Sequence, residues 1–144
     1  DELVALAEDD DEILAVLAHE LGHVRERHGL RTFLQGTAVG IAVALFFGDV
    51  STVLAGVPAF LLETKYSRDF ERQADAYAAA MLRANDIPAA RLGAILQRLE
   101  AAASGAAAAD EEEEAAEPRP RSSLSRYLSS HPLTEERLEA LGER

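Results

Sequence analysis

The sequence predicts a mainly α-helical protein. Of its 144 residues, 48% are hydrophobic but only 6% are aromatic, and alanine, the best helix former, supplies much of the apolar content. Apolar residues recur at helical spacing in several segments, and no run of alternating β-branched residues predicts a strand. This length suits one domain with its own core, so we expect residues 1–144 to form a single domain.

The first helix is predicted over residues 10–28. Asp9 and the acidic residues after it offer an N-cap and favourable charge in the first turn. Gly29 suits a left-handed cap at the other end, and His28 is expected to be a helix-terminal residue rather than a ligand. We expect the apolar face of this helix to be buried and the opposite face, which bears two histidines, to line a cleft. The apolar residues are Ile13, Leu14, Leu17, Leu21 and Val24.

Residues 32–62 are predicted to form an apolar helical hairpin. Asp49 is the only charged residue there. With Gly48 it divides the segment into two pieces, each shorter than the roughly 20 residues that a membrane-spanning helix needs. We therefore favour a buried or interfacial hairpin over a spanning one, and membrane contact through this segment stays open.

The second half of the chain is predicted to hold four more helices. Apolar spacing and turn residues place them over residues 66–85, 88–103, 122–130 and 134–142. The intervening residues 101–121 are acidic, rich in alanine and glutamate, and low in complexity. We interpret 101–121 as a linker or surface loop.

Composition excludes several classes of function. The net charge of −12 argues against nucleic acid as a partner and against electrostatic binding to anionic membranes. The chain has no cysteine, so disulfides and thiolate metal sites are excluded. It opens without an initiator methionine or a signal-like segment, and we interpret it as a fragment of a longer protein.

The stretch VLAHELGHVRERHG, residues 16–29, places His19 and His23 one helical turn apart. At this spacing both imidazoles can direct a nitrogen toward one tetrahedral zinc ion. Glu20 is rotated away from His19 but remains close enough to take a proton from a metal-bound water and pass it to a leaving amine. The alternative is a hydrated helix face, on which His and Glu are common, but the H-E-x-x-H pattern favours a metal site.

A catalytic zinc needs a third protein ligand, and a later predicted helix offers one. The stretch SRDFERQADAYAAAML, residues 67–82, carries Glu71 and Asp75 four apart on one face. Glu71 could ligate zinc, and Asp75 could accept the ring N–H of a ligand histidine and so fix its tautomer. Without the upstream motif we would interpret these residues as a solvated charged face.

These motifs together resemble the membrane-associated gluzincin metalloproteases, the family of HtpX and the CAAX prenyl protease. The family pattern is an H-E-x-x-H helix followed by E-x-x-A-D on a later helix, and residues 19–23 and 71–75 match it. A third stretch, SSHPLTEERLEAL at residues 129–141, is similar to the family's H-P-x-x-x-x-R ending.

The resemblance implies roles for two distant residues. It places His131 near the zinc, where it stabilises the oxyanion or blocks the open position in a latent form. It also implies that Arg137 pairs with carboxylates that hold the site together. From the residues alone, His131 would be a turn residue before proline, and Tyr127 is a weaker candidate for an oxyanion donor.

The start of the chain departs from the family pattern. Members of the family usually place a strand just upstream of the active helix, and the substrate backbone lies along it as an added strand. Here the chain begins shortly before that helix. We therefore expect the upstream β-sheet to be missing or minimal.

The sequence thus predicts a zinc metalloendopeptidase that binds one Zn²⁺ per chain and acts on proteins or peptides. His19, His23 and Glu71 are its predicted ligands, with Glu20 as general base and His131 as a second catalytic residue. The resemblance places the protein at the membrane or envelope of a bacterium, in protein quality control. The alternatives are a zinc-stabilised chaperone or assembly factor blocked by His131, and a helical membrane-associated module in which zinc is incidental.

Overall fold

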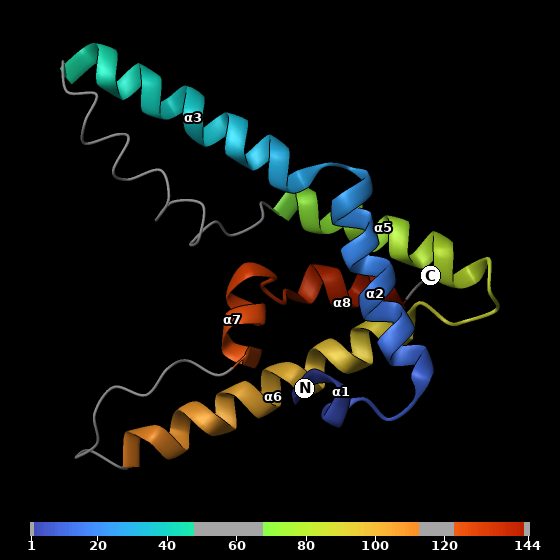
Figure 1. Ribbon diagram of the computed structural model, residues 1–144. Coiled ribbons are helices and arrows are strands. Elements are labelled where there is room, and N and C mark those ends of the chain that lie inside the picture. Colours follow the sequence, from blue (N-terminus) through green and yellow to red (C-terminus); the bar gives the residue numbers. More distant parts are fainter. Residues whose placement is uncertain (1, 48–67, 113–122, 143–144) are drawn as a thin grey trace.

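Helices make up the architecture of the residues that the structure describes, which are 2–47, 68–112 and 123–142 of this computed structural model (Figure 1). No strand occurs within these ranges, so the predicted mainly α-helical class is confirmed. The helices are α1 (Glu2–Leu6), α2 (Asp10–Arg25), α3 (His28–Phe47), α5 (Arg68–Arg83), α6 (Ala90–Glu112), α7 (Ser123–Ser130) and α8 (Glu135–Gly142).

The caps of α2 differ from the prediction at one end. Asp9 is the N-cap, and its side chain accepts a hydrogen bond from the backbone N–H of Glu12 at 3.1 Å. The helix ends at Arg25, and Arg27 makes the turn in the left-handed conformation, with φ at 56°. α3 then begins at His28, so the predicted left-handed cap at Gly29 is wrong.

The crossing of α2 and α5 is the most extensive helix contact and positions the polar residues of both helices. Gly22 lies against Ala74, and a Cβ atom on Gly22 would stand 2.8 Å from the Ala74 Cα atom. Only glycine permits this approach, because a Cβ at that distance overlaps the backbone. The facing surfaces of the two helices are therefore almost in backbone contact.

A leucine-rich core lies beside this crossing and joins α6 to the other helices. The fully buried residues of α6 pack against small and aliphatic residues of α2 and α5 and against one leucine each from α7 and α8. The cluster consists of Ala15, Val16, Ala18, Ala78, Leu82, Leu92, Ile95, Leu96, Leu99, Leu124 and Leu141. Through α6, the C-terminal helices α7 and α8 are held at the same end of the molecule as α2 and α5 (Figure 1).

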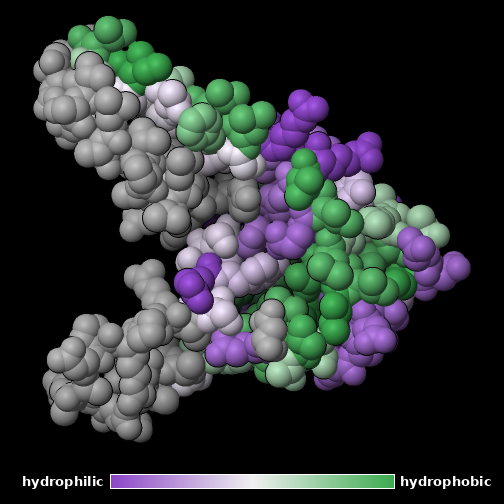
Figure 2. Space-filling view, viewed as in Figure 1, coloured by the Kyte–Doolittle hydropathy of each residue, from purple (hydrophilic) through white to green (hydrophobic). Residues whose placement is uncertain are grey.

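The buried face of α2 is opposite to the predicted one. The apolar stripe remains on the surface, with Leu17 53% and Val24 72% exposed, and hydrophobic side chains gather over α2 in Figure 2. The buried face carries the histidines together with small residues, because only that face fits closely against α5. The prediction that this helix buries its apolar face and opens its histidines to a cleft is therefore wrong.

Two segments predicted from composition lie partly outside the described residues. Residues 32–47 belong to the single helix α3, which extends away from the other helices (Figure 1), while 48–62 are not described, so the hairpin stays a prediction. α6 continues to Glu112, so residues 101–112 are helical and not part of a linker, while the rest of the predicted linker lies outside the described residues. An alanine-rich run favours helix over loop, which accounts for the difference.

Of the helices in the described ranges, none combines the length and the apolar character needed to cross a membrane.

Candidate metal centre

α2 supplies two histidines that meet one turn apart in the interior. Both side chains are buried, and their Nε2 atoms lie 3.0 Å from each other. The spacing of four residues along the helix brings the two rings onto one face, as the sequence predicted for His19 and His23. Their nitrogens therefore converge on one point beside the helix.

α5 brings a carboxylate to the same point. Glu71 is buried; its Oε2 atom lies 3.4 Å from His19 Nε2, and its Oε1 atom lies 3.4 Å from His23 Nε2. Glu71 reaches the two histidines because the contact between Gly22 and Ala74, one turn away, holds α2 and α5 close together. Two helices thus bring three candidate ligand residues to a shared centre.

The separations between these side-chain atoms are close to those around a tetrahedral zinc ion. Ligands about 2.0–2.1 Å from a tetrahedral zinc stand about 3.3 Å from one another. The Nε2 atoms of His19 and His23 are 3.0 Å apart, and each lies 3.4 Å from a Glu71 oxygen, Oε2 for His19 and Oε1 for His23. Imidazole nitrogen and carboxylate oxygen are also the donor types that zinc accepts when no thiolate is present.

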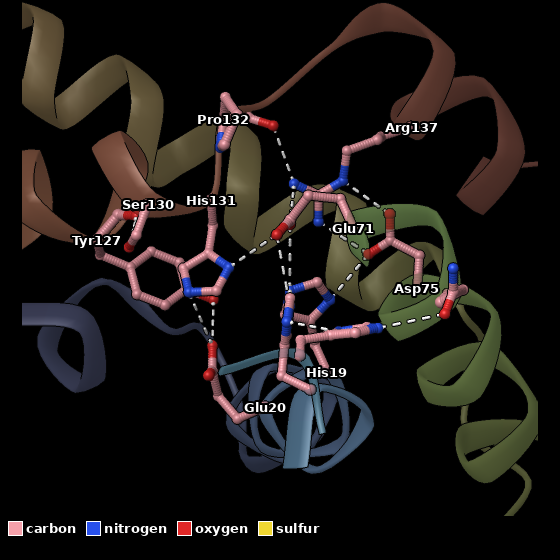
Figure 3. Close-up of polar contacts among 12 residues, drawn as sticks. His19, Glu20, Glu71, Asp75, Tyr127, Ser130, His131, Pro132 and Arg137 are labelled. Atoms are coloured by element: carbon pink, nitrogen blue, oxygen red, sulfur yellow. Dashed lines mark hydrogen bonds and ion pairs between the residues drawn. The ribbon is translucent and has the colours of Figure 1, made fainter. Parts of the chain in front are cut away.

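Asp75 and Arg137 surround the centre and hold its members in place (Figure 3). Asp75 Oδ1 lies 2.9 Å from His19 Nδ1, which leaves His19 Nε2 directed at the centre. Arg137, from α8, donates from Nε and Nη2 to the two oxygens of Asp75 at 2.7 and 2.8 Å. Its Nη1 atom lies 2.9 Å from Glu71 Oε2, so one buried guanidinium orients both carboxylates.

His131 approaches the centre from the turn between α7 and α8. Its Nδ1 atom lies 3.2 Å from Glu71 Oε1, and one of its nitrogens falls within 4.8 Å of the ligand atoms of His19, His23 and Glu71. These four buried residues form a group that can hold a metal ion. His131 is thus close enough to be one of the residues that could hold the ion.

Glu20 lies next to His131 and Tyr127 (Figure 3). The Tyr127 hydroxyl donates a hydrogen bond to Glu20 Oε1 at 3.0 Å, and His131 Nε2 lies 3.7 Å from the same oxygen. The Tyr127 ring stacks on His131 with centroids 4.7 Å apart. Glu20 is 40% exposed, which suits a carboxylate that exchanges protons near solvent.

The cluster shifts the pKa values of its members in opposite directions. Burial disfavours the charged form of His19, but hydrogen bonds to Asp75 and Glu71 outweigh burial and raise its pKa to about 9. Burial, assisted by the neighbouring His19, lowers the pKa of His23 to about 3. Burial acts to raise the pKa of Glu71, yet hydrogen bonds with His131 and His19 lower it to about 2. Glu71 is thus ionised and His23 neutral, the forms in which both bind metals, whereas a metal that binds His19 must displace a proton from its ring.

The structure brings all the predicted site residues into one cluster. These are His19, Glu20, His23, Glu71, Asp75, His131 and Arg137, and their roles as ligands, base and supports stay predictions. Sequence reasoning missed the contact of His28 with His23, whose Nδ1 atoms lie 3.0 Å apart. A spacing of five residues is off the helical period, so only the turn at Arg27 reveals it.

Comparison with known proteins decides the family of the chain. Residues 1–144 match the family model described as peptidase family M48. The chain belongs to peptidase family M48. This confirms the resemblance that the three motifs predicted, and it makes the protein a member of a family of peptidases.

Several curated bacterial proteins are similar to this member of the family. Each is named "Protease HtpX homolog": one from Trichormus variabilis is 32% identical, one from a Nostoc species 33%, and one from Tropheryma whipplei 32%. The alignments cover 92–94% of this chain but 54% of each relative, so the chain spans about half the length of the relatives it matches. No solved structure matches the chain.

Proposed function

We propose that the protein is a zinc-dependent metalloendopeptidase that hydrolyses peptide bonds in proteins or peptides. The observation that carries the proposal is the convergence of His19, His23 and Glu71 at the separations that tetrahedral zinc requires. Membership in a peptidase family supports it. One Zn²⁺ per chain is expected, because the described residues form one such cluster.

The chemistry divides between the metal and Glu20. Zinc bound at this centre would supply Lewis acidity to polarise the scissile carbonyl and to lower the pKa of water. Glu20 takes a proton from the water as its oxygen attacks the carbonyl carbon, and it passes that proton to the leaving amine nitrogen as the C–N bond breaks. Asp75 and Arg137 hold His19 and Glu71 in the orientation that this requires.

We further propose that the protein acts at the membrane of the bacterial cell envelope, in the quality control of membrane or envelope proteins. The bacterial relatives bear the name of the protease HtpX. Apolar side chains exposed along α2 and α3, including Leu17, Leu34 and Leu45, suit a surface that meets lipid or unfolded protein.

The substitution Glu20→Gln tests the catalytic assignment. It keeps the shape of the side chain but removes the proton acceptor, so we expect zinc content to be unchanged and hydrolysis of an unfolded casein substrate to fall by about 10²–10⁴-fold. Glu26→Gln, on the exposed end of the same helix region, is the matched control and should keep full activity. Unchanged cleavage by the Glu20→Gln protein would remove Glu20 from the mechanism.

A second candidate function is a zinc-stabilised chaperone or assembly factor with a latent site. The position of His131 favours it, because this ring lies 3.2 Å from Glu71 and close enough to the three proposed ligands to take the remaining coordination position. If His131 blocks the site, His131→Ala should turn an inactive protein into an active protease. A loss of existing cleavage in the same variant would instead assign His131 to oxyanion stabilisation.

A further inference from the structure

His28 is fully buried, although the residues on both sides of it, Arg27 and Gly29, are exposed. Burying an imidazole is costly unless its nitrogens are hydrogen-bonded. The left-handed turn at Arg27 folds the chain so that the first residue of α3 points back beneath the end of α2. Placing His28 here therefore requires both a strained turn and the burial of a polar ring.

The contacts of His28 connect the candidate metal centre to α5. Its Nδ1 atom lies 3.0 Å from Nδ1 of His23, and its Nε2 atom lies 3.3 Å from Oε1 of Gln73. The ring stacks on Phe70 with centroids 4.3 Å apart and planes 9° from parallel. Arg31 Nη1 also donates to Gln73 Oε1, at 3.2 Å.

The chemistry of these groups assigns a direction to each hydrogen bond when the His28 ring is neutral. A guanidinium only donates, so the Gln73 atom that Arg31 contacts is the amide oxygen, an acceptor. His28 Nε2 must then carry the hydrogen that Gln73 accepts, which leaves a lone pair on Nδ1 of a neutral His28 ring. That lone pair accepts from His23 Nδ1–H. His23 consequently keeps its own lone pair on Nε2, the nitrogen directed at His19 and Glu71.

We propose that His28 and Gln73 are positioning residues that fix the tautomer and ring orientation of His23 as a metal ligand. The proposal rests on the proposed zinc site and deepens it. Each candidate ligand histidine then has a partner for its second nitrogen: Asp75 from α5 for His19, and His28 from α3 for His23. Because the partner is an imidazole and not a carboxylate, it orients His23 without adding negative charge to a centre that already holds two carboxylates.

Zinc affinity of the purified protein, measured by competition with a chelator, tests this assignment. His28→Phe keeps a ring that can stack on Phe70 but offers His23 no acceptor, so we expect zinc binding to weaken about 10- to 100-fold. His28→Gln restores both an acceptor and a donor and should recover most of that affinity. Gln73→Leu should weaken binding in the same direction, while Gln97→Leu, an exposed glutamine on α6, should have no effect.

Coupling between the substitutions separates positioning from a general loss of stability. Gln73 acts through His28, so the double variant His28→Phe/Gln73→Leu should bind zinc no more weakly than His28→Phe alone. The visible spectrum of the Co²⁺-loaded protein should also change in His28→Phe and return with His28→Gln, because it reports the geometry of the ligands. If His28 and Gln73 only stabilised the fold, the effects of the two substitutions would not be coupled in this way. The Co²⁺ spectrum of the folded variants would also stay unchanged.

The outcomes distinguish this proposal from the one on which it rests. If the native protein binds no stoichiometric zinc, the proposed function fails. If the native protein binds zinc and folded His28→Phe binds it within about twofold of native affinity, the role of His28 is overturned. Should His28→Phe fail to fold, Gln73→Leu decides, since unchanged affinity and an unchanged Co²⁺ spectrum in that variant would equally overturn it.

Discussion

At the scale of single residues, Asp75 is the carboxylate on which most of the candidate centre depends. It contacts His19 Nδ1 at 2.9 Å and receives two hydrogen bonds from Arg137. The hydrogen bonds with His19 and Arg137 outweigh the effect of burial and hold the pKa of this carboxyl below its usual value. Asp75 is therefore charged at neutral pH and serves both the ligand histidine and the buried guanidinium.

Asp75→Asn should weaken both zinc binding and folding. The neutral amide leaves the buried Arg137 with less compensating charge, so we expect the free energy of unfolding to fall by about 3 kcal/mol, by denaturant titration. Zinc affinity should fall about 10- to 100-fold because His19 loses its charged partner.

The matched control for this substitution lies on the same helix. Asp69→Asn removes a carboxylate that is 70% exposed and paired with Arg72, and it should change stability by less than about 1 kcal/mol. Equal effects of the two substitutions would contradict the central place of Asp75.

At the scale of the helix, the sequence predicted that α2 exists and carries the two histidines, but not which face it buries. The prediction compared the hydrophobicity of the helix faces, and the leucines of α2 lie on the most apolar face. The structure buries the other face because its small residues, Ala15, Ala18 and Gly22, permit close approach of α5. Helix spacing alone does not contain that information, since it depends on the partner helix.

Gly22→Ala tests whether close approach of α2 and α5 builds the site. The added Cβ would stand 2.8 Å from backbone of Ala74, so the helices must separate, at a cost of about 1–3 kcal/mol. Alanine recovers up to about 1 kcal/mol of helix propensity, and we expect net destabilisation together with weaker zinc binding.

Gly29→Ala is the control for that experiment. A Cβ atom on Gly29 meets no atom of the described residues within 4 Å, so this substitution should be neutral or stabilising. A Gly22→Ala protein that is more stable than the native one and binds zinc as well would contradict the packing account.

At the scale of the whole molecule, the order of three motifs predicted the family and its set of site residues better than any local pattern did. His131 and Arg137 reach Glu71 and Asp75 across 60 and 62 positions of sequence. No periodicity connects residues so far apart, and only the resemblance led to them. The contact between His28 and Gln73 was missed because neither is a specified position of the H-E-x-x-H or E-x-x-A-D pattern. Their contact also depends on the turn between α2 and α3.

The candidate centre is built from segments that lie far apart in the sequence. α2 supplies two of its candidate ligands, α5 the third, the turn before α8 His131, and α8 Arg137. A metal ion bound there ties together segments from both ends of the chain. Binding to the folded state alone would stabilise the whole molecule by mass action.

Metal content of the purified chain and of Glu71→Ala is the most direct test of the central claim. The account predicts one zinc per chain in the native protein and in Glu20→Gln, and loss of zinc from Glu71→Ala while its helical circular dichroism is retained. A native protein without stoichiometric zinc, or a Glu71→Ala protein that holds zinc as tightly as the native one, would contradict it.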